Sequence, residues 1–119
     1  MIFLCYPKCS TCRKAKKWLA ENDIPFSERN IKDEAPSLEE LKLWYSQSGL
    51  PLKKFFNTSG TIYKSMNLKD TLPSMTEGEQ LELLATDGML VKRPILIWNE
   101  RVLVGFNQQE WENLVKELR

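Results

Sequence analysis

The spacing of hydrophobic residues changes several times along the chain, and each change marks an expected element. The run from Ile2 to Cys5 is continuously apolar and predicts a buried strand. From Ser10 to Asn22, apolar residues recur every three or four positions with lysines between them, which predicts an amphipathic helix. Pro25 to Ile31 has apolar residues near its ends and predicts a second strand. A strand, a helix and a strand within about 30 residues indicate a parallel βαβ unit.

The middle of the chain, from Lys32 to Lys92, is predicted to be helical throughout. It carries two capping boxes, the pattern in which a serine or threonine and a glutamate three residues later start a helix. A glycine is expected to end each of these helices. The two sets are Ser37 with Glu40 before Gly49, and Thr76 with Glu79 before Gly88.

Strands return after this helical block. Ile95–Trp98 and Arg101–Val104 are separated by two polar residues and predict a hairpin, and Asn107 is placed to start a final amphipathic helix. The order βαβ, helical block, ββα is the layout of a thioredoxin-like fold. We therefore expect an α/β domain over residues 1–119, with a four-stranded mixed sheet and a helical insert at about 33–92 between the second and third strands.

The composition of the chain excludes several kinds of ligand and active site. The 119 residues include 17 basic and 16 acidic side chains, so a net charge of +1 gives no overall attraction to nucleic acid or membrane. Histidine is absent, which excludes His-activated nucleophiles and His-ligated metals. The apolar start breaks at Pro7, too early for a signal peptide or a membrane span. We expect a cytoplasmic protein with neither a metal nor a bound cofactor.

Cys9 and Cys12 form a C-x-x-C motif between the first strand and the helix that follows it, the context of thioredoxin-type redox motifs. Cys9 falls at the helix N-terminus, where free N–H groups and the helix dipole favour a thiolate. Cys12 lies one turn further on, within reach of a disulfide. Nearby cations are expected to lower the thiol pKa further: Lys8, Arg13, Lys14, Lys16 and Lys17. The motif predicts Cys9 as the attacking thiolate and Cys12 as the resolving thiol.

Two plainer interpretations stand beside this one. Paired cysteines on a helix can be ordinary core residues. A zinc site would need two more ligands, and Cys5 and carboxylates are the remaining candidates. Cys5 itself lies among apolar residues of the first strand, and we expect it to pack in the core.

Arg93 and Pro94 precede the third predicted strand, where thioredoxin-like folds place a cis proline against the active-site cysteines. A cis Arg93–Pro94 bond would bring Arg93 beside Cys9. Its guanidinium could there bind an oxyanion or stabilise a thiolate. The alternative is an arginine that only ends the helical block.

Three segments together resemble the arsenate reductase/Spx-like (ArsC) family: Tyr6–Ala15, Arg93–Ile95 and Val104–Phe106. The resemblance extends over essentially the whole chain, the helical insert included. It implies that Cys9 corresponds to the catalytic cysteine of glutathione-coupled arsenate reductases, and Arg93 to one of their three oxyanion-binding arginines. It also implies that Cys9 and Cys12 correspond to the redox switch of Spx regulators, which bind the RNA polymerase α subunit.

The chain departs from both branches of that family. Cys12 adds a second cysteine that those reductases lack, and Asn57 and Val104 stand near the positions of their other two arginines. Leu52 stands near the position of the glycine that Spx uses for polymerase contact. The main hypothesis is therefore a thiol–disulfide oxidoreductase. A Spx-like regulator and a glutathione-coupled arsenate reductase are the alternatives.

The main hypothesis also predicts which residues contact the substrate. Lys8, Arg13, Arg93 and Pro94 are predicted to contact a thiol, disulfide or oxyanion substrate. A cellular thiol, either glutathione or the thioredoxin system, is the expected reductant. No direct contact with nucleic acid is expected.

Overall fold

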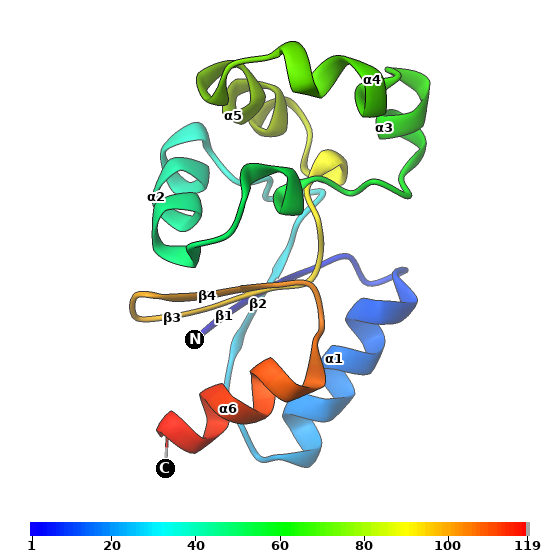
Figure 1. The fold of residues 1–119 in the computed structure, drawn as a ribbon. Coiled ribbons are helices and arrows are strands. Elements are labelled where there is room, and N and C mark those ends of the chain that lie inside the picture. The colour runs from blue at the N-terminus through cyan, green and yellow to red at the C-terminus, as the bar shows by residue number, and fades with distance from the viewer. Residues whose placement is uncertain (119) are drawn as a thin grey trace.

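The computed structural model describes residues 1–118, and a four-stranded mixed sheet runs through its centre (Figure 1). The spatial order of the strands is β2-β1-β3-β4. Strand β1 is parallel to β2 and antiparallel to β3, and β3 is antiparallel to β4. This arrangement confirms the predicted thioredoxin-like sheet. The strand bounds are β1 Ile2–Cys5, β2 Ser27–Asn30, β3 Ile95–Trp98 and β4 Arg101–Val104.

Helices cover both faces of the sheet (Figure 1). Helices α1 (Ser10–Glu21) and α6 (Gln108–Leu118) lie on one face. The insert between β2 and β3 lies on the other. Its α-helices are α2 (Leu38–Ser48), α3 (Thr61–Ser65), α4 (Leu68–Thr71) and α5 (Glu77–Thr86), and its 3₁₀ turns are η1 (Leu52–Phe55), η2 (Leu72–Ser74) and η3 (Gly88–Leu90).

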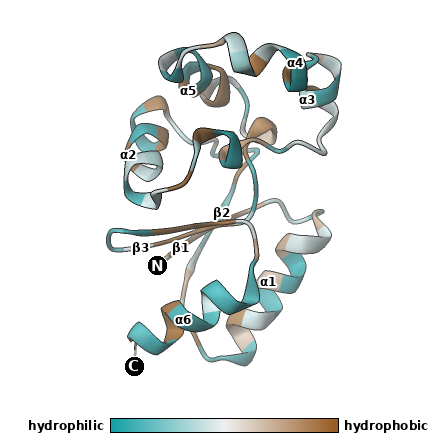
Figure 2. Cartoon of the chain, viewed as in Figure 1, coloured by the Kyte–Doolittle hydropathy of each residue, from teal (hydrophilic) through white to brown (hydrophobic). Residues whose placement is uncertain are grey.

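The sheet separates two hydrophobic cores, and the alternation of side chains along each strand supplies both. On β1, Phe3 and Cys5 pack with α1 and α6, whereas Leu4 packs with the insert. On β3, Leu96 packs on the first side, and Ile95 and Ile97 pack on the second. The two central strands, β1 and β3, are accordingly hydrophobic along their length (Figure 2), as expected for strands buried on both faces.

The capping signals in the sequence are confirmed. In α2 the Ser37 side chain accepts from the Glu40 N–H, and the Glu40 carboxylate accepts from the Ser37 N–H. Helix α5 begins with the same reciprocal pair. Gly49 ends α2 in the left-handed conformation with φ of 68°, and Asn107 accepts from Glu110 at the start of α6.

The role predicted for Gly88 is wrong. Helix α5 ends at Thr86, and Gly88 opens the η3 turn that follows. Gly88 is needed for space, since a Cβ built on it would lie 1.8 Å from the Ile31 carbonyl oxygen. This glycine therefore lets the η3 turn pack directly against the backbone that leaves β2.

The middle of the chain is also not helical throughout. Phe56 and Val91 form an isolated antiparallel bridge outside the main sheet. Two backbone hydrogen bonds form it, from the Asn57 N–H to the Leu90 oxygen at 2.8 Å and from the Lys92 N–H to the Phe55 oxygen at 2.7 Å. The bridge holds the loop after η1 beside the segment that leads into β3. Over residues 1–118, no helix has the length and apolar character needed to cross a membrane.

Candidate active site

Cys9 is the N-cap residue of α1, as the motif predicts. Its backbone is extended, and its carbonyl oxygen accepts the N–H of Arg13 at 3.1 Å, which closes the first turn of the helix. Its own N–H donates to the Tyr6 oxygen at 2.9 Å, so a tight turn carries the chain from β1 into α1. The thiol is half-exposed at the end of the helix where N–H groups are unpaired.

The pKa of the Cys9 thiol is lowered from its usual value. Burial acts in the opposite direction and raises it, but hydrogen bonding to the backbone and side chain of Cys12, to Arg93 and to the Thr11 backbone outweighs that effect. The N–H groups of Thr11 and Cys12 lie at the start of the helix and stabilise the charged form of the thiol. The chain therefore favours a thiolate at Cys9.

Cys12 has the opposite character. Its side chain is 2% exposed, and burial raises its pKa to about 12, even though the Tyr6 N–H donates to its sulfur at 3.3 Å. The neighbouring Cys9 charge raises that pKa further. Two thiols one helical turn apart thus differ strongly in acidity.

Arg93 supplies the cation of the site. The Arg93–Pro94 peptide bond is cis, as predicted, and Arg93 is among the groups that lower the pKa of Cys9. The guanidinium carbon lies 5.3 Å from the centre of the Tyr6 ring, and Nη1 donates weakly to the Met89 oxygen at 3.5 Å. Its Nε is buried and has no hydrogen-bond partner among the described residues. A buried donor left unpaired costs free energy, which an acceptor bound against Arg93 would recover.

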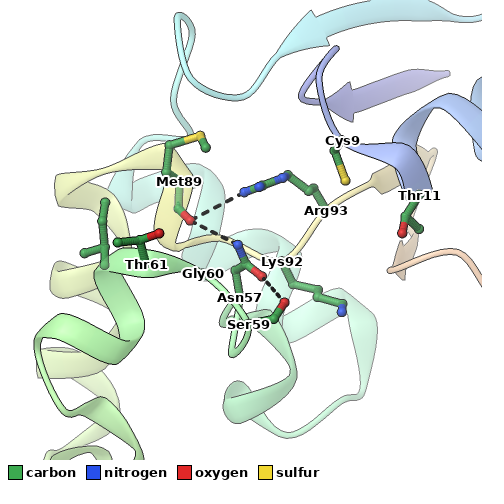
Figure 3. Close-up of a pocket in the computed structure, with 10 residues that line it drawn as sticks. Cys9, Thr11, Asn57, Ser59, Gly60, Thr61, Met89, Lys92 and Arg93 are labelled. Carbon is green, nitrogen blue, oxygen red and sulfur yellow. Dashed lines mark hydrogen bonds between the residues drawn. The ribbon is translucent and has the colours of Figure 1, made fainter.

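A cavity of about 400 Å³ opens in front of Cys9 and Arg93 (Figure 3). The residues that line it come from the start of α1, from the loop that begins α3, and from the segment before β3. They are Cys9, Thr11, Asn57, Ser59, Gly60, Thr61, Ile62, Met89, Lys92 and Arg93. The cavity has room for a small molecule or for an extended segment of a protein substrate.

The other residues predicted for the site do not line the cavity. Lys8 is exposed and does not line the cavity. The Nε of Arg13 turns back to donate to the Pro7 oxygen at 2.9 Å. Pro94 is buried, and its oxygen accepts from the Gly105 N–H at 2.7 Å. Val104 lies in β4, opposite Ile95, and packs against the core on the insert side.

Two lysines of α1 form ion pairs with glutamates rather than contacting Cys9. Lys16 pairs with Glu28 at 3.0 Å, and Lys17 pairs with Glu21 at 3.8 Å. The main contributors to the acidity of Cys9 are the N–H groups of the helix and Arg93, rather than the run of cations that the sequence suggests.

Met89 and Lys92 line the cavity although the sequence did not predict them there, and Asn57, near the position of an oxyanion-binding arginine of the family, lines it as well. Asn57 is 9% exposed; its Nδ2 donates to the Met89 oxygen at 3.5 Å, and its Oδ1 accepts from Ser59 at 3.2 Å. The Met89 carbonyl oxygen thus accepts hydrogen bonds from both Asn57 and Arg93. The bridge between Phe56 and Val91 brings these residues together. Over residues 1–118, no group of three or more His, Cys, Asp or Glu side chains is arranged to hold a metal ion.

Comparisons with known proteins agree with this geometry. The sequence model of the ArsC family matches residues 4–114. Uncharacterized protein YusI of Bacillus subtilis is 56% identical over 94% of this chain and 95% of its own. The global transcriptional regulator Spx of Enterococcus faecalis is 38% identical over 87% of this chain and 77% of its own. The crystal structure named for a possible arsenate reductase, from Streptococcus mutans, superposes with a TM-score of 0.85 at 40% identity and covers 93% of this chain and 96% of its own.

Proposed function

The chain belongs to the ArsC family, and within that family we propose that it is a thiol–disulfide oxidoreductase that uses Cys9 and Cys12 as its redox pair. The observation that carries this proposal is the difference in acidity between the two thiols. The pKa of Cys9 is lowered, whereas burial raises that of Cys12 to about 12. Cys9 also faces an open cavity, whereas Cys12 is buried behind it.

This division fits a two-step exchange. The Cys9 thiolate attacks one sulfur of a substrate disulfide, forms a mixed disulfide and displaces the other sulfur as a thiolate. Cys12 then loses its proton and attacks the Cys9 sulfur, which releases the second substrate thiolate. The two cysteines are oxidised to the Cys9–Cys12 disulfide, and the substrate gains two electrons and, in water, two protons.

Arg93 and the helix N-terminus have a consistent role in both steps. Their positive potential stabilises the Cys9 thiolate before attack and again when reduction of the disulfide releases it. An external thiol, from glutathione or the thioredoxin system, regenerates the reduced pair. These thiols are supplied by the reducing cytoplasm, where we place the protein.

The test is turnover of bis(2-hydroxyethyl) disulfide with glutathione or with thioredoxin as the electron donor. We expect Cys9→Ser to abolish turnover, and Cys12→Ser to accumulate the mixed disulfide on Cys9. Ser10→Ala is the matched control, because it changes the C-x-x-C segment and keeps all three cysteines. Wild-type turnover that persists in Cys9→Ser would contradict the proposal.

The likeness to Spx favours a second candidate, a regulator in which the same pair switches contact with the RNA polymerase α subunit. Binding of the isolated α C-terminal domain, measured with the reduced and the oxidised protein, separates the two functions. A redox-dependent complex together with absent disulfide turnover would favour the regulator.

The likeness to a structure named for a possible arsenate reductase supports a third candidate, in which Cys9 attacks arsenate and Arg93 binds it. Arg93 has an unpaired Nε beside the cavity, and Lys92 adds a second cation. Asn57 and Val104 carry no charge to replace two further arginines. We therefore rank arsenate below a disulfide as the substrate.

A further inference from the structure

A second and smaller cavity, of about 120 Å³, lies on the other side of Cys12. Cys5 and Cys12 both line it, together with Glu28, Lys16, Pro7 and Arg13. The larger cavity is lined by Cys9 but by neither of the other two cysteines. Cys12 therefore shares a cavity with Cys5, and it lies one helical turn from Cys9, which lines the larger cavity.

Cys12 lies close to the end of β1. Its sulfur accepts the N–H of Tyr6 at 3.3 Å, and that nitrogen belongs to the peptide bond that directly follows Cys5. Charge on Cys12 is among the smaller causes that raise the pKa of Cys5. Both side chains are only 2% exposed, so both are shielded from thiols in solution.

Cys5 also has a proton acceptor. Its thiol donates to the Glu28 carboxylate at 3.4 Å, and the same carboxylate oxygen pairs with Lys16 at 3.0 Å. Burial and Glu28 raise the pKa of Cys5 to about 12, so the thiol stays protonated until a base removes its proton. A carboxylate in direct hydrogen-bonding contact is such a base.

We propose that Cys5 is a third redox thiol, which takes over the disulfide from Cys9 and stores it in the interior as Cys5–Cys12. The proposal rests on the proposed function, because the Cys9–Cys12 disulfide must form first. Oxidation would then be held away from solvent, while Cys9 returns to the thiolate form at the cavity.

The step balances within the chain. Glu28 accepts the proton of Cys5, and the resulting Cys5 thiolate attacks the Cys12 sulfur. The Cys5–Cys12 bond forms, the Cys9–Cys12 bond breaks, and Cys9 leaves as a thiolate. Cys5 is oxidised and Cys9 is reduced, so the number of disulfides is unchanged. Cys9 is the favoured leaving group because Arg93 and the helix N–H groups stabilise its thiolate.

The sequence offers a direct assay. Trypsin cleaves after Lys8 and Arg13, so Cys5 lies in peptide 1–8, whereas Cys9 and Cys12 share peptide 9–13. A Cys9–Cys12 disulfide stays within one peptide, and a Cys5–Cys12 disulfide joins the two. We would oxidise the protein with one equivalent of diamide, block free thiols with N-ethylmaleimide at low pH, digest it and assign the disulfides by tandem mass spectrometry.

In wild-type protein we expect joined peptides with Cys9 alkylated. In Cys9→Ser no Cys9–Cys12 disulfide can form, so Cys5 and Cys12 should both remain free thiols. In Cys5→Ser, the internal Cys9–Cys12 form alone should remain. A Cys9–Cys12 disulfide with Cys5 alkylated in oxidised wild type, and the same disulfide in Cys5→Ser, would overturn the third-thiol proposal and leave the proposed function standing. If no intrachain disulfide formed in either wild type or Cys5→Ser, the proposed function would fail as well.

Glu28→Gln tests the proton acceptor separately. Glu28 also raises the pKa of Cys5, so its removal eases ionisation of that thiol. We expect loss of the base to dominate and the joined peptides to appear more slowly at pH 7; faster appearance would remove Glu28 from the mechanism. The difference from wild type should vanish at high pH, where hydroxide removes the proton instead. A merely structural role for Glu28 would not give this pH dependence, so equal slowing at all pH values would remove Glu28 from the mechanism.

Discussion

Gly88→Ala is expected to destabilise the protein sharply. The added Cβ would lie 1.8 Å from the Ile31 oxygen and 2.9 Å from the Ile31 carbon. Both atoms belong to the backbone that leaves β2, so no flexible side chain can move aside. Overpacking of a buried site costs about 1–3 kcal/mol, and we place this backbone clash near 3 kcal/mol. With a slope of about 1–3 kcal/mol per molar urea, the unfolding midpoint should fall by about 1–3 M.

Gly78→Ala is the matched control. A Cβ at Gly78 meets nothing closer than the Thr76 hydroxyl at 3.9 Å, and replacing a glycine within a helix by alanine stabilises it by about 0.5–1 kcal/mol. Urea unfolding followed by the fluorescence of the buried Trp44 and Trp111 reports both variants. If Gly88→Ala unfolded at the wild-type midpoint, the packing of the η3 turn against Ile31 described above would be refuted.

Three other predictions concern charge. Arg93→Met should slow alkylation of Cys9 at pH 7, and Arg93→Lys should restore part of the rate; equal rates in both variants and wild type would contradict a role for the guanidinium. Hydrogen bonding to Arg29 lowers the pKa of Glu40 to about 2, so this carboxylate contributes stability above about pH 4.5 that is lost as the pH falls toward 2. Glu40→Gln should reduce the loss of unfolding free energy between about pH 4.5 and 2 by about 1 kcal/mol, as measured by urea unfolding at each pH. The effect is this small because the pair is partly exposed. With glutathione as the donor in both assays, arsenate turnover should be far below disulfide turnover, and arsenate turnover that fell sharply in Arg93→Met would instead favour the reductase.

Local signals in the sequence predict most of the fold. The apolar run at Ile2–Cys5 and the capping box at Ser37 act through neighbouring residues, so a short window contains the whole interaction. The same holds for the C-x-x-C motif, which places Cys9 at the helix start without any tertiary information. The resemblance to the ArsC family, drawn from three short segments, is confirmed by the match over residues 4–114.

The remainder depends on contacts between distant segments. Gly88 has the signature of a helix end, but its close approach to Ile31 is a contact across 57 positions of the numbering that no local pattern reveals. Asn57 and Lys92 reach the cavity because Phe56 pairs with Val91, and neither segment shows strand periodicity. The lysines of α1 were predicted to lower the pKa of Cys9 because they are close to it in sequence. Their charges do not lie at its sulfur, so closeness in sequence was misleading here.

The most direct test of the central claim is the pH dependence of iodoacetamide alkylation in Cys12→Ser and Cys9→Ser. The claim is that Cys9 is the thiolate and Cys12 its buried, protonated partner. Cys12→Ser, which keeps Cys9, should react rapidly at neutral pH with an apparent pKa below the usual range for cysteine. Cys9→Ser should stay unreactive until strongly alkaline pH. Comparable rates for the two variants near pH 7 would contradict the assignment of attacking and resolving thiols.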